Sequence, residues 1–202
     1  MSFTDKSRRL CLWELAGLFA LCAVLLAGLW AEGRQASIAG SLVRLHVLAV
    51  SDAPEEQAVK LKVKDAVLAC LAPRLKDVQN AEEAETVLTE NLALIQAAAE
   101  QAAQGRPVRV SLSEERYPTR DYADFSLPAG RYRSLRVVLG EGLGHNWWCV
   151  VFPPVCLAAA EKEAMQPVMN PVDYALITRE DGWEIRFRIV ELWGKILNSV
   201  EF

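Results

Sequence analysis

The chain has 202 residues, a length that suits one ordinary domain with a hydrophobic core and excludes two large domains. Hydrophobic residues make up 52% of the sequence and charged residues 24%, which excludes a disordered chain and a polytopic membrane protein. The net charge of −4 gives no overall attraction to nucleic acid, so we predict no nucleic-acid partner.

The first thirty residues differ from that average, because Lys6, Arg8 and Arg9 precede an apolar run over residues 10–30. The positive-inside rule places this basic flank in the cytosol and predicts that the chain after the run is exported. The uncharged stretch 15–31 is short for a spanning helix and long for a signal peptide, so both a membrane anchor and a cleaved signal remain open. A buried core helix is a third alternative, which the charged flanks disfavour.

We therefore divide the chain into a signal peptide or membrane anchor with a short linker, residues 1–39, and one exported domain, residues 40–202. Small residues typical of cleavage sites occur at 31–33 and 37–39. Taking the four basic and three acidic residues of 1–39 from totals of 22 and 26 leaves 18 basic and 23 acidic residues. The predicted domain is thus mildly acidic, with a net charge of −5.

Three cysteines lie in the predicted domain, and an odd number permits at most one internal disulfide. Cys149 and Cys156 are the predicted pair, because Pro153 and Pro154 between them form an extended or turning connection. Two buried thiols are the open alternative, since spacing does not establish disulfide geometry. The sequence has no C-x-x-C and no Cys/His spacing typical of zinc, so we predict no metal.

Four runs are predicted as strands from alternation or β-rich composition: residues 42–50, 108–113, 132–139 and 147–152. The last two are joined by the glycine-rich residues 140–144, and a β-hairpin is the simplest arrangement. The alternation in residues 108–113 predicts one wet face. Residues 185–189 alternate in the same way, and residues 190–200 form an amphipathic pattern.

Two long helices are predicted between these strands. The first begins near Pro54 behind a cap of Ser51-Asp52 and ends near Pro73. The second runs between Asn80, which has a glutamate three residues later, and Gly105. The predicted fold class is therefore α+β: a single mixed domain of strands with two long helices, preceded by one N-terminal helix.

The motifs that usually carry chemistry are weak here. GEGLG at 140–144 lacks the Lys-Ser/Thr of a P-loop and precedes a strand, so we predict no cofactor and no small-molecule ligand. Cys149 with one of the two histidines is a candidate nucleophile pair, and Glu55 with Glu56 or Asp121 with Asp124 a candidate carboxylate pair. Such patterns are more often structural, and we assign no catalytic residue.

A dense block of aromatic, arginine and glycine residues covers positions 117–156. Its two adjacent tryptophans point to opposite faces of a strand, so one is predicted to be buried while the other reaches the second face or solvent. An exposed aromatic residue beside a glycine-rich loop is typical of a protein-binding anchor, although both faces being covered is the alternative. The candidate partner-binding residues are Tyr117, Arg120, Gly140, Glu141, Gly142, Gly144, Asn146, Trp147 and Trp148.

Three segments carry a resemblance to a known family: VRLHVLAV, SDAPEEQAVKLKVKDAVL and YPTRDYADFSLPAGRYRSLRVVLGEGLGHNWWCVVFPPVC. Together they cover residues 42–156 and are similar to the stage II sporulation protein R family of endospore-forming bacteria. The motif GEGLGHNWWCVVFPP is long and unusual, which makes the resemblance specific.

The resemblance implies a signalling protein and not an enzyme. Such a protein is made in the forespore and exported into the intermembrane space, where residues 10–30 anchor it or are cleaved to release it. It activates there a membrane-embedded aspartic protease that processes the mother-cell pro-sigma factor. An exported envelope hydrolase or thiol enzyme using Cys149 or a carboxylate is the alternative.

Overall fold

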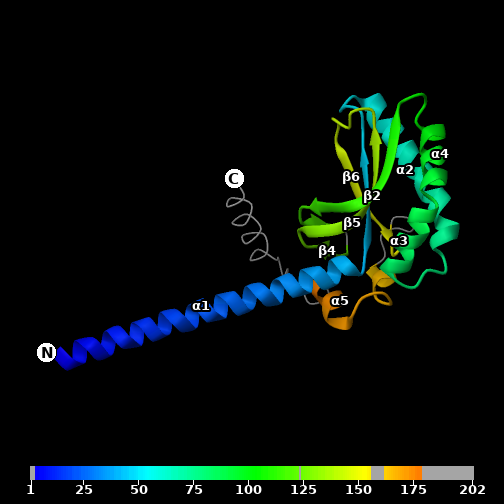
Figure 1. Ribbon diagram of the computed structural model, residues 1–202. Helices are drawn as coiled ribbons and strands as arrows, with labels where there is room; N and C mark the ends of the chain where they lie inside the picture. Colours follow the sequence, from blue (N-terminus) through cyan, green and yellow to red (C-terminus); the bar gives the residue numbers. More distant parts are fainter. Residues whose placement is uncertain (1–2, 123, 156–161, 179–202) are drawn as a thin grey trace.

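A four-stranded mixed sheet forms the centre of the domain in the computed structural model, which describes residues 3–122, 124–155 and 162–178. Its strands lie in the order β2-β5-β1-β6 (Figure 1). Their bounds are Val43–Leu48 for β1, Val108–Tyr117 for β2, Gly130–Leu139 for β5 and Asn146–Phe152 for β6. Central β1 runs parallel to β5 and antiparallel to β6, and β2 runs antiparallel to β5. The predicted α+β class is confirmed.

The hairpin predicted from residues 132–139 and 147–152 is wrong, because β1 lies between these two strands. All six residues of β1 are buried, and a direct β5–β6 pair would move this strand to an exposed edge. The glycine-rich connection therefore crosses two strand spacings, about 10 Å.

Three helices cover one face of the sheet: α2 (Pro54–Leu75), α3 (Ala81–Glu90) and α4 (Leu92–Ala102) (Figure 1). Residues of α2 such as Val63, Val67 and Leu71 form one buried cluster with Leu45 and Leu135 of the sheet. The second long helix predicted after Asn80 is divided into α3 and α4. The break occurs at Asn91, whose backbone leaves the helical region (φ −105°, ψ 9°) while its side chain donates to the carbonyl of Val87.

One of the two predicted caps forms. Asn80 accepts a hydrogen bond from the backbone N–H of Glu83 at 2.9 Å, as its capping pattern predicts. The Ser51-Asp52 cap is wrong, because Ala53 occupies the N-cap of α2 without a side-chain hydrogen bond. The Asp52 carboxylate accepts instead from His145 in the glycine-rich connection.

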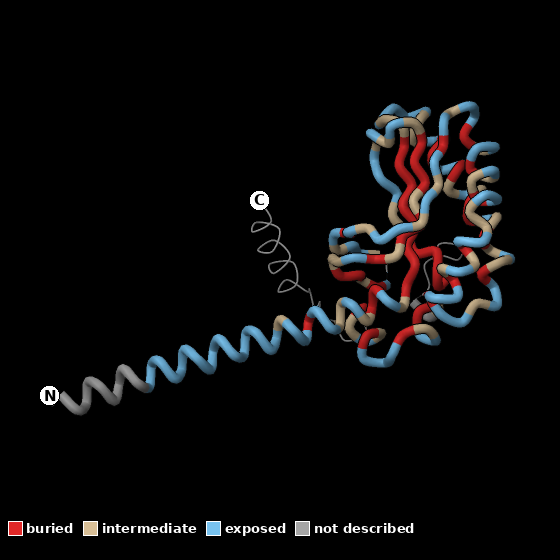
Figure 2. Tube along the Cα trace, viewed as in Figure 1, coloured by how far each residue is buried: buried red, intermediate tan, exposed pale blue. Residues whose placement is uncertain are grey.

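The N-terminal helix α1 spans Phe3–Gly40, and within it Leu12–Gly40 is long and apolar enough to cross a membrane. Figure 2 shows its described outer part exposed along its length. Its last turns pack on the domain: Ile38 is fully buried, and Arg34 and Ser37 bind the carboxylate of Asp173. The boundary placed at residue 39 therefore falls inside this helix, within a segment that contributes to the core.

The second face of the sheet is covered at one end. There the end of α1 meets β3 (Arg120–Asp121), β4 (Ser126–Leu127), the 3-10 turn η1 (Lys162–Met165) and α5 (Pro171–Ile177). Their buried side chains form a second cluster that includes Ile38, Leu42, Phe125, Leu127, Tyr132, Val150 and Met165. The strand and helix predicted over residues 185–200, and Cys156, lie outside the described residues.

Candidate functional site

A row of polar and aromatic side chains crosses the second face beyond that covered end. The strand register pairs Ser111 with Arg136, Arg136 with His46, and His46 with Trp148, so these residues form one line across all four strands. We call this region, with neighbouring Arg109 and Arg120, the open face. Ser111 and Arg109 are exposed, which confirms the wet face predicted for residues 108–113.

A hydrogen-bonded network centred on His46 holds the open face together. Nδ1 of His46 lies 3.2 Å from the Glu115 carboxylate, and Nε2 lies 2.9 Å from Oδ1 of Asn146. Ser134 donates to the same carboxylate at 2.6 Å, and the Tyr117 hydroxyl lies 2.6 Å from the Ser134 hydroxyl. Both ring nitrogens of His46 are thus engaged in positioning contacts.

Glu115 is the anionic centre of the network. Burial alone raises the pKa of its carboxyl. Hydrogen bonds with His46 and Ser134 and the charges of His46 and Arg136 lower this pKa by a larger amount. The net pKa lies below the ordinary 4.5, so Glu115 is ionised at neutral pH. Glu115 also forms an ion pair with Arg136, whose Nε lies 3.3 Å from the carboxylate.

Arg44, a fully buried arginine, lies two residues before His46 on the same face of β1. Its guanidinium carbon is 3.9 Å from the ring centre of Tyr117 and 5.0 Å from that of Tyr132. One nitrogen donates to the Tyr122 hydroxyl at 2.8 Å, whereas Nε and Nη1 have no hydrogen-bond partner. Stacking on the two rings therefore holds the cation in place.

The two adjacent tryptophans point to opposite faces, as predicted, but neither is buried: Trp147 is 37% exposed and Trp148 is half-buried. Trp148 lies on the open face, 5.6 Å from the His46 ring, with the Arg120 guanidinium 3.9 Å above its centre. Trp147 lies on the helix side, where Nζ of Lys64 is 4.9 Å from its ring centre.

The glycines of residues 140–144 allow backbone conformations and close contacts that other residues do not. Gly140 and Gly142 adopt positive φ angles of 56° and 67°, which glycine adopts without strain. Gly144 donates to the carbonyl of Ala49, and a Cβ there would lie 2.3 Å from the Ser51 carbonyl oxygen.

Two charged residues fix the same connection to α2. His145 donates its backbone N–H to Asp52 and contacts that carboxylate with Nδ1, and these bonds lower the pKa of Asp52. Lys60 donates to the His145 carbonyl at 2.9 Å. The exposed apolar group of the connection is Leu143, with 80% of its surface accessible.

The nine partner-binding candidates therefore separate. Arg120, Asn146 and Trp148 lie at the open face, whereas Tyr117 is buried in the cluster of the covered end. Gly140, Glu141, Gly142 and Gly144 belong to the connection between β5 and β6, and Trp147 lies on the helix side. Sequence reasoning did not select Arg44, Arg109, Glu115, Ser134, Arg136 or Leu143, and considered His46 only as the base of a cysteine. The alternating patterns held part of this signal, because they placed Arg44, His46 and Arg109 opposite the apolar residues.

The cysteines bear on the thiol-enzyme alternative. Cys149 is disulfide-bonded, while Cys22 and Cys70 are free. A bonded Cys149 has no thiol to act as nucleophile. Its pairing with Cys156 stays a prediction. Among the described residues, no three His, Cys, Asp or Glu side chains are grouped to hold a metal.

The fold and the site define an α+β domain that follows an apolar helix compatible with export or membrane anchoring. The family model described as stage II sporulation protein R matches residues 39–162, and the chain belongs to this family. The stage II sporulation protein R of Bacillus subtilis (strain 168) is 31% identical over 186 residues, covering 79% of this chain and 83% of the relative. No solved structure matches the chain.

Proposed function

We propose that this protein is an exported sporulation signal. It is made in the forespore, reaches the intermembrane space, and there activates a membrane-embedded aspartic protease that processes the mother-cell pro-sigma factor. Its membership in the stage II sporulation protein R family supports a role in sporulation. The apolar helix in front of the domain supports export.

Activation of a protease by a bound domain requires preferential binding. The domain shifts the protease toward its active form only if it binds that form more tightly than the inactive one. A shift from about 1% to about 99% active requires a preference of roughly 10⁴-fold. Contact with the extracytoplasmic part of the protease, or stabilisation of a protease dimer, provides such a preference.

Co-expression tests the proposal. The full chain, a chain lacking residues 1–33 and an empty vector are each expressed with the protease and the pro-sigma substrate in a non-sporulating host. The shortened chain keeps Arg34 and Ile38, so it retains their contacts with the domain. We expect processing with the full chain and none with the other two. Processing that is indifferent to this protein contradicts the proposal.

The paired tryptophans supply a matched test of the partner surface. Trp148→Ala is expected to reduce processing at least tenfold, because large aromatic residues dominate binding energy at protein interfaces. Trp147→Ala, on the helix side, is the control and is expected to stay within about twofold of wild type if recognition uses the open face. If both variants fold and process normally, the tryptophans are not contact residues.

Substitutions at Cys149 distinguish a signalling protein from an enzyme that uses this cysteine as a nucleophile. A nucleophile tolerates neither Cys149→Ser nor Cys149→Ala, even in folded protein. Loss of a disulfide lowers stability by about 2–4 kcal/mol, and reduction of the wild type reproduces the loss. We expect the second result, measured by denaturant unfolding beside the processing assay.

A further inference from the structure

We propose that the open face docks an extended, acidic segment of the protein partner. This inference rests on the proposed function and names the surface and the chemistry by which the partner is recognised. The segment crosses the sheet, with carboxylates at the β2 side and an apolar or aromatic side chain at the β6 side.

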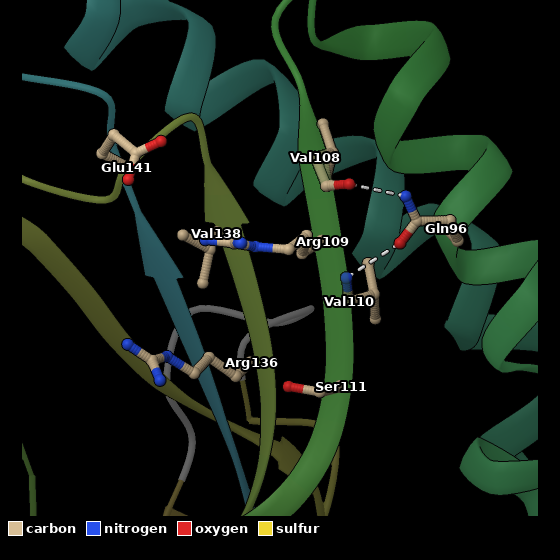
Figure 3. A pocket seen from close by; sticks show the side chains of 8 residues that line it. All are labelled: Gln96, Val108, Arg109, Val110, Ser111, Arg136, Val138 and Glu141. Carbon is tan, nitrogen blue, oxygen red and sulfur yellow. Dashed lines mark hydrogen bonds between the residues drawn. The ribbon is translucent and has the colours of Figure 1, made fainter.

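A cavity of about 460 Å³ marks the β2 side of this surface. It is lined by residues that include Gln96, Arg109, Ser111, Arg136, Val138 and Glu141 (Figure 3). Arg109 and Arg136 come from adjacent strands and both line the cavity, with the Ser111 hydroxyl near them. Two guanidinium groups and a hydroxyl are groups that bind carboxylates.

The charge of the open face is opposite to that of the domain. Arg109, Arg120 and Arg136 gather here, although residues 40–202 carry 18 basic and 23 acidic residues. Glu115, the carboxylate within the face, is already engaged by His46, Ser134 and Arg136. Glu141 stands at the rim of the cavity. With Arg136 paired to Glu115, Arg109 and Arg120 leave the face with a net positive charge, which is complementary to an acidic partner.

Gln96 limits how a segment can bind at the β2 edge of the sheet. Its side-chain amide donates to the carbonyl of Val108 and accepts from the N–H of Val110, both at 2.8 Å (Figure 3). These are the backbone groups that an added strand pairs with, so the partner does not extend the sheet here. The side chains that line the open face bind the partner segment instead.

The width of the sheet sets the length of the segment. From β2 to β6 there are three strand spacings of about 4.8 Å, roughly 14 Å in total. An extended chain covers that distance in about four or five residues. At the far side, the exposed Arg120 guanidinium is stacked on half-buried Trp148, and its outer face is a flat surface on which an aromatic or aliphatic side chain packs. The expected ligand therefore has two acidic residues and, about four residues away, an aromatic or aliphatic one.

The position of the face favours a protein over lipid headgroups. Strand β1 starts three residues after α1 ends, and His46 lies six residues beyond Gly40. An extended chain of this length spans about 20 Å, which places the row away from the helix that enters the membrane.

Charge reversal tests the inference in the co-expression assay. Arg109→Glu, with Arg109 exposed, is expected to reduce processing about fivefold, and Arg109→Glu/Arg136→Glu at least twentyfold. The matched control is Lys62→Glu/Lys76→Glu, which makes the same change in net charge at exposed positions of and just after α2. Arg136 contacts Glu115, so a folding defect in the double variant leaves the single variant to decide. Normal processing by folded Arg109→Glu overturns the inference.

A binding measurement separates this inference from the proposed function. The full chain in nonionic detergent micelles is titrated with the peptide (Glu-Tyr)₄, with (Lys-Tyr)₄, and with phosphatidylglycerol added to the micelles. We expect binding of the acidic peptide alone, weakened at least tenfold in Arg109→Glu. Phosphatidylglycerol binding that depends on Arg109 assigns the face to lipid, and absence of acidic-peptide binding overturns the inference. Absence of processing with wild type, beside normal peptide binding, contradicts the proposed function alone.

Discussion

The two faces of the sheet differ in what covers them. On one face, α2, α3 and α4 bury an apolar layer that runs the length of the strands. On the other, the end of α1 and the segments around α5 cover one end, and the remainder carries Arg136, His46 and Trp148. The first face has the composition of a core, whereas the second combines charge, aromatic rings and hydrogen bonds. The first face therefore supplies most of the buried apolar surface, and the second is the face for which we propose a role in recognition.

The largest expected effect concerns the covered end of the second face. Removing residues 1–39 is expected to lower the free energy of unfolding by about 4 kcal/mol relative to removing residues 1–33. The longer deletion loses the buried side chain of Ile38 and leaves buried Asp173 without Arg34 and Ser37. Urea denaturation of the two shortened chains measures the difference. Equal stability would show that the end of α1 is not part of the domain.

A second variant compares the two faces directly. Leu45→Ala, in the apolar layer, is expected to cost about 3 kcal/mol through lost burial and a cavity. Ser111→Ala, exposed on the open face, is expected to change stability by less than about 0.5 kcal/mol. Denaturant unfolding of both variants tests the comparison, and similar costs would contradict it.

Arg44 tests whether the second face needs a buried charge. Arg44→Ala is expected to cost about 2 kcal/mol, because the space between Tyr117 and Tyr132 is left empty. Arg44→Met fills much of that space without a charge and is expected to fall within about 1 kcal/mol of wild type, since two of the guanidinium nitrogens have no partner. A large loss in both variants would assign a net stabilising role to the charge.

The smallest expected effect is the pH dependence contributed by Glu115. Its folded pKa lies below the ordinary 4.5, so its contribution is complete above that pH and is lost as pH falls through the folded pKa. Glu115→Gln is expected to cost about 1 kcal/mol at neutral pH and less near pH 3. Urea unfolding at both pH values, with exposed Glu114→Gln as control, measures the change. A pH-independent cost would contradict this role.

Local patterns in the sequence were sufficient for the elements that one segment determines alone. Alternation predicted the strand at residues 108–113 and its wet face, and Asn80 with Glu83 predicted the start of α3. Period 2 in a strand and the caps of a helix depend on neighbours in the chain, so they can be inferred from the sequence. The opposite orientations of Trp147 and Trp148 follow from the same rule.

Pairing between distant segments was decided by the tertiary structure. The sequence suggested that residues 132–139 and 147–152 pair, because they are adjacent along the chain. Burial of the whole of β1 places that strand between them instead.

The candidate site follows from this pairing. His46, Glu115 and Asn146 are separated by 31 residues or more, and the register brings them within hydrogen-bond distance. The sequence determined which residues face away from the apolar layer, whereas the sheet order, set by burying β1 on both sides, determined which of them meet.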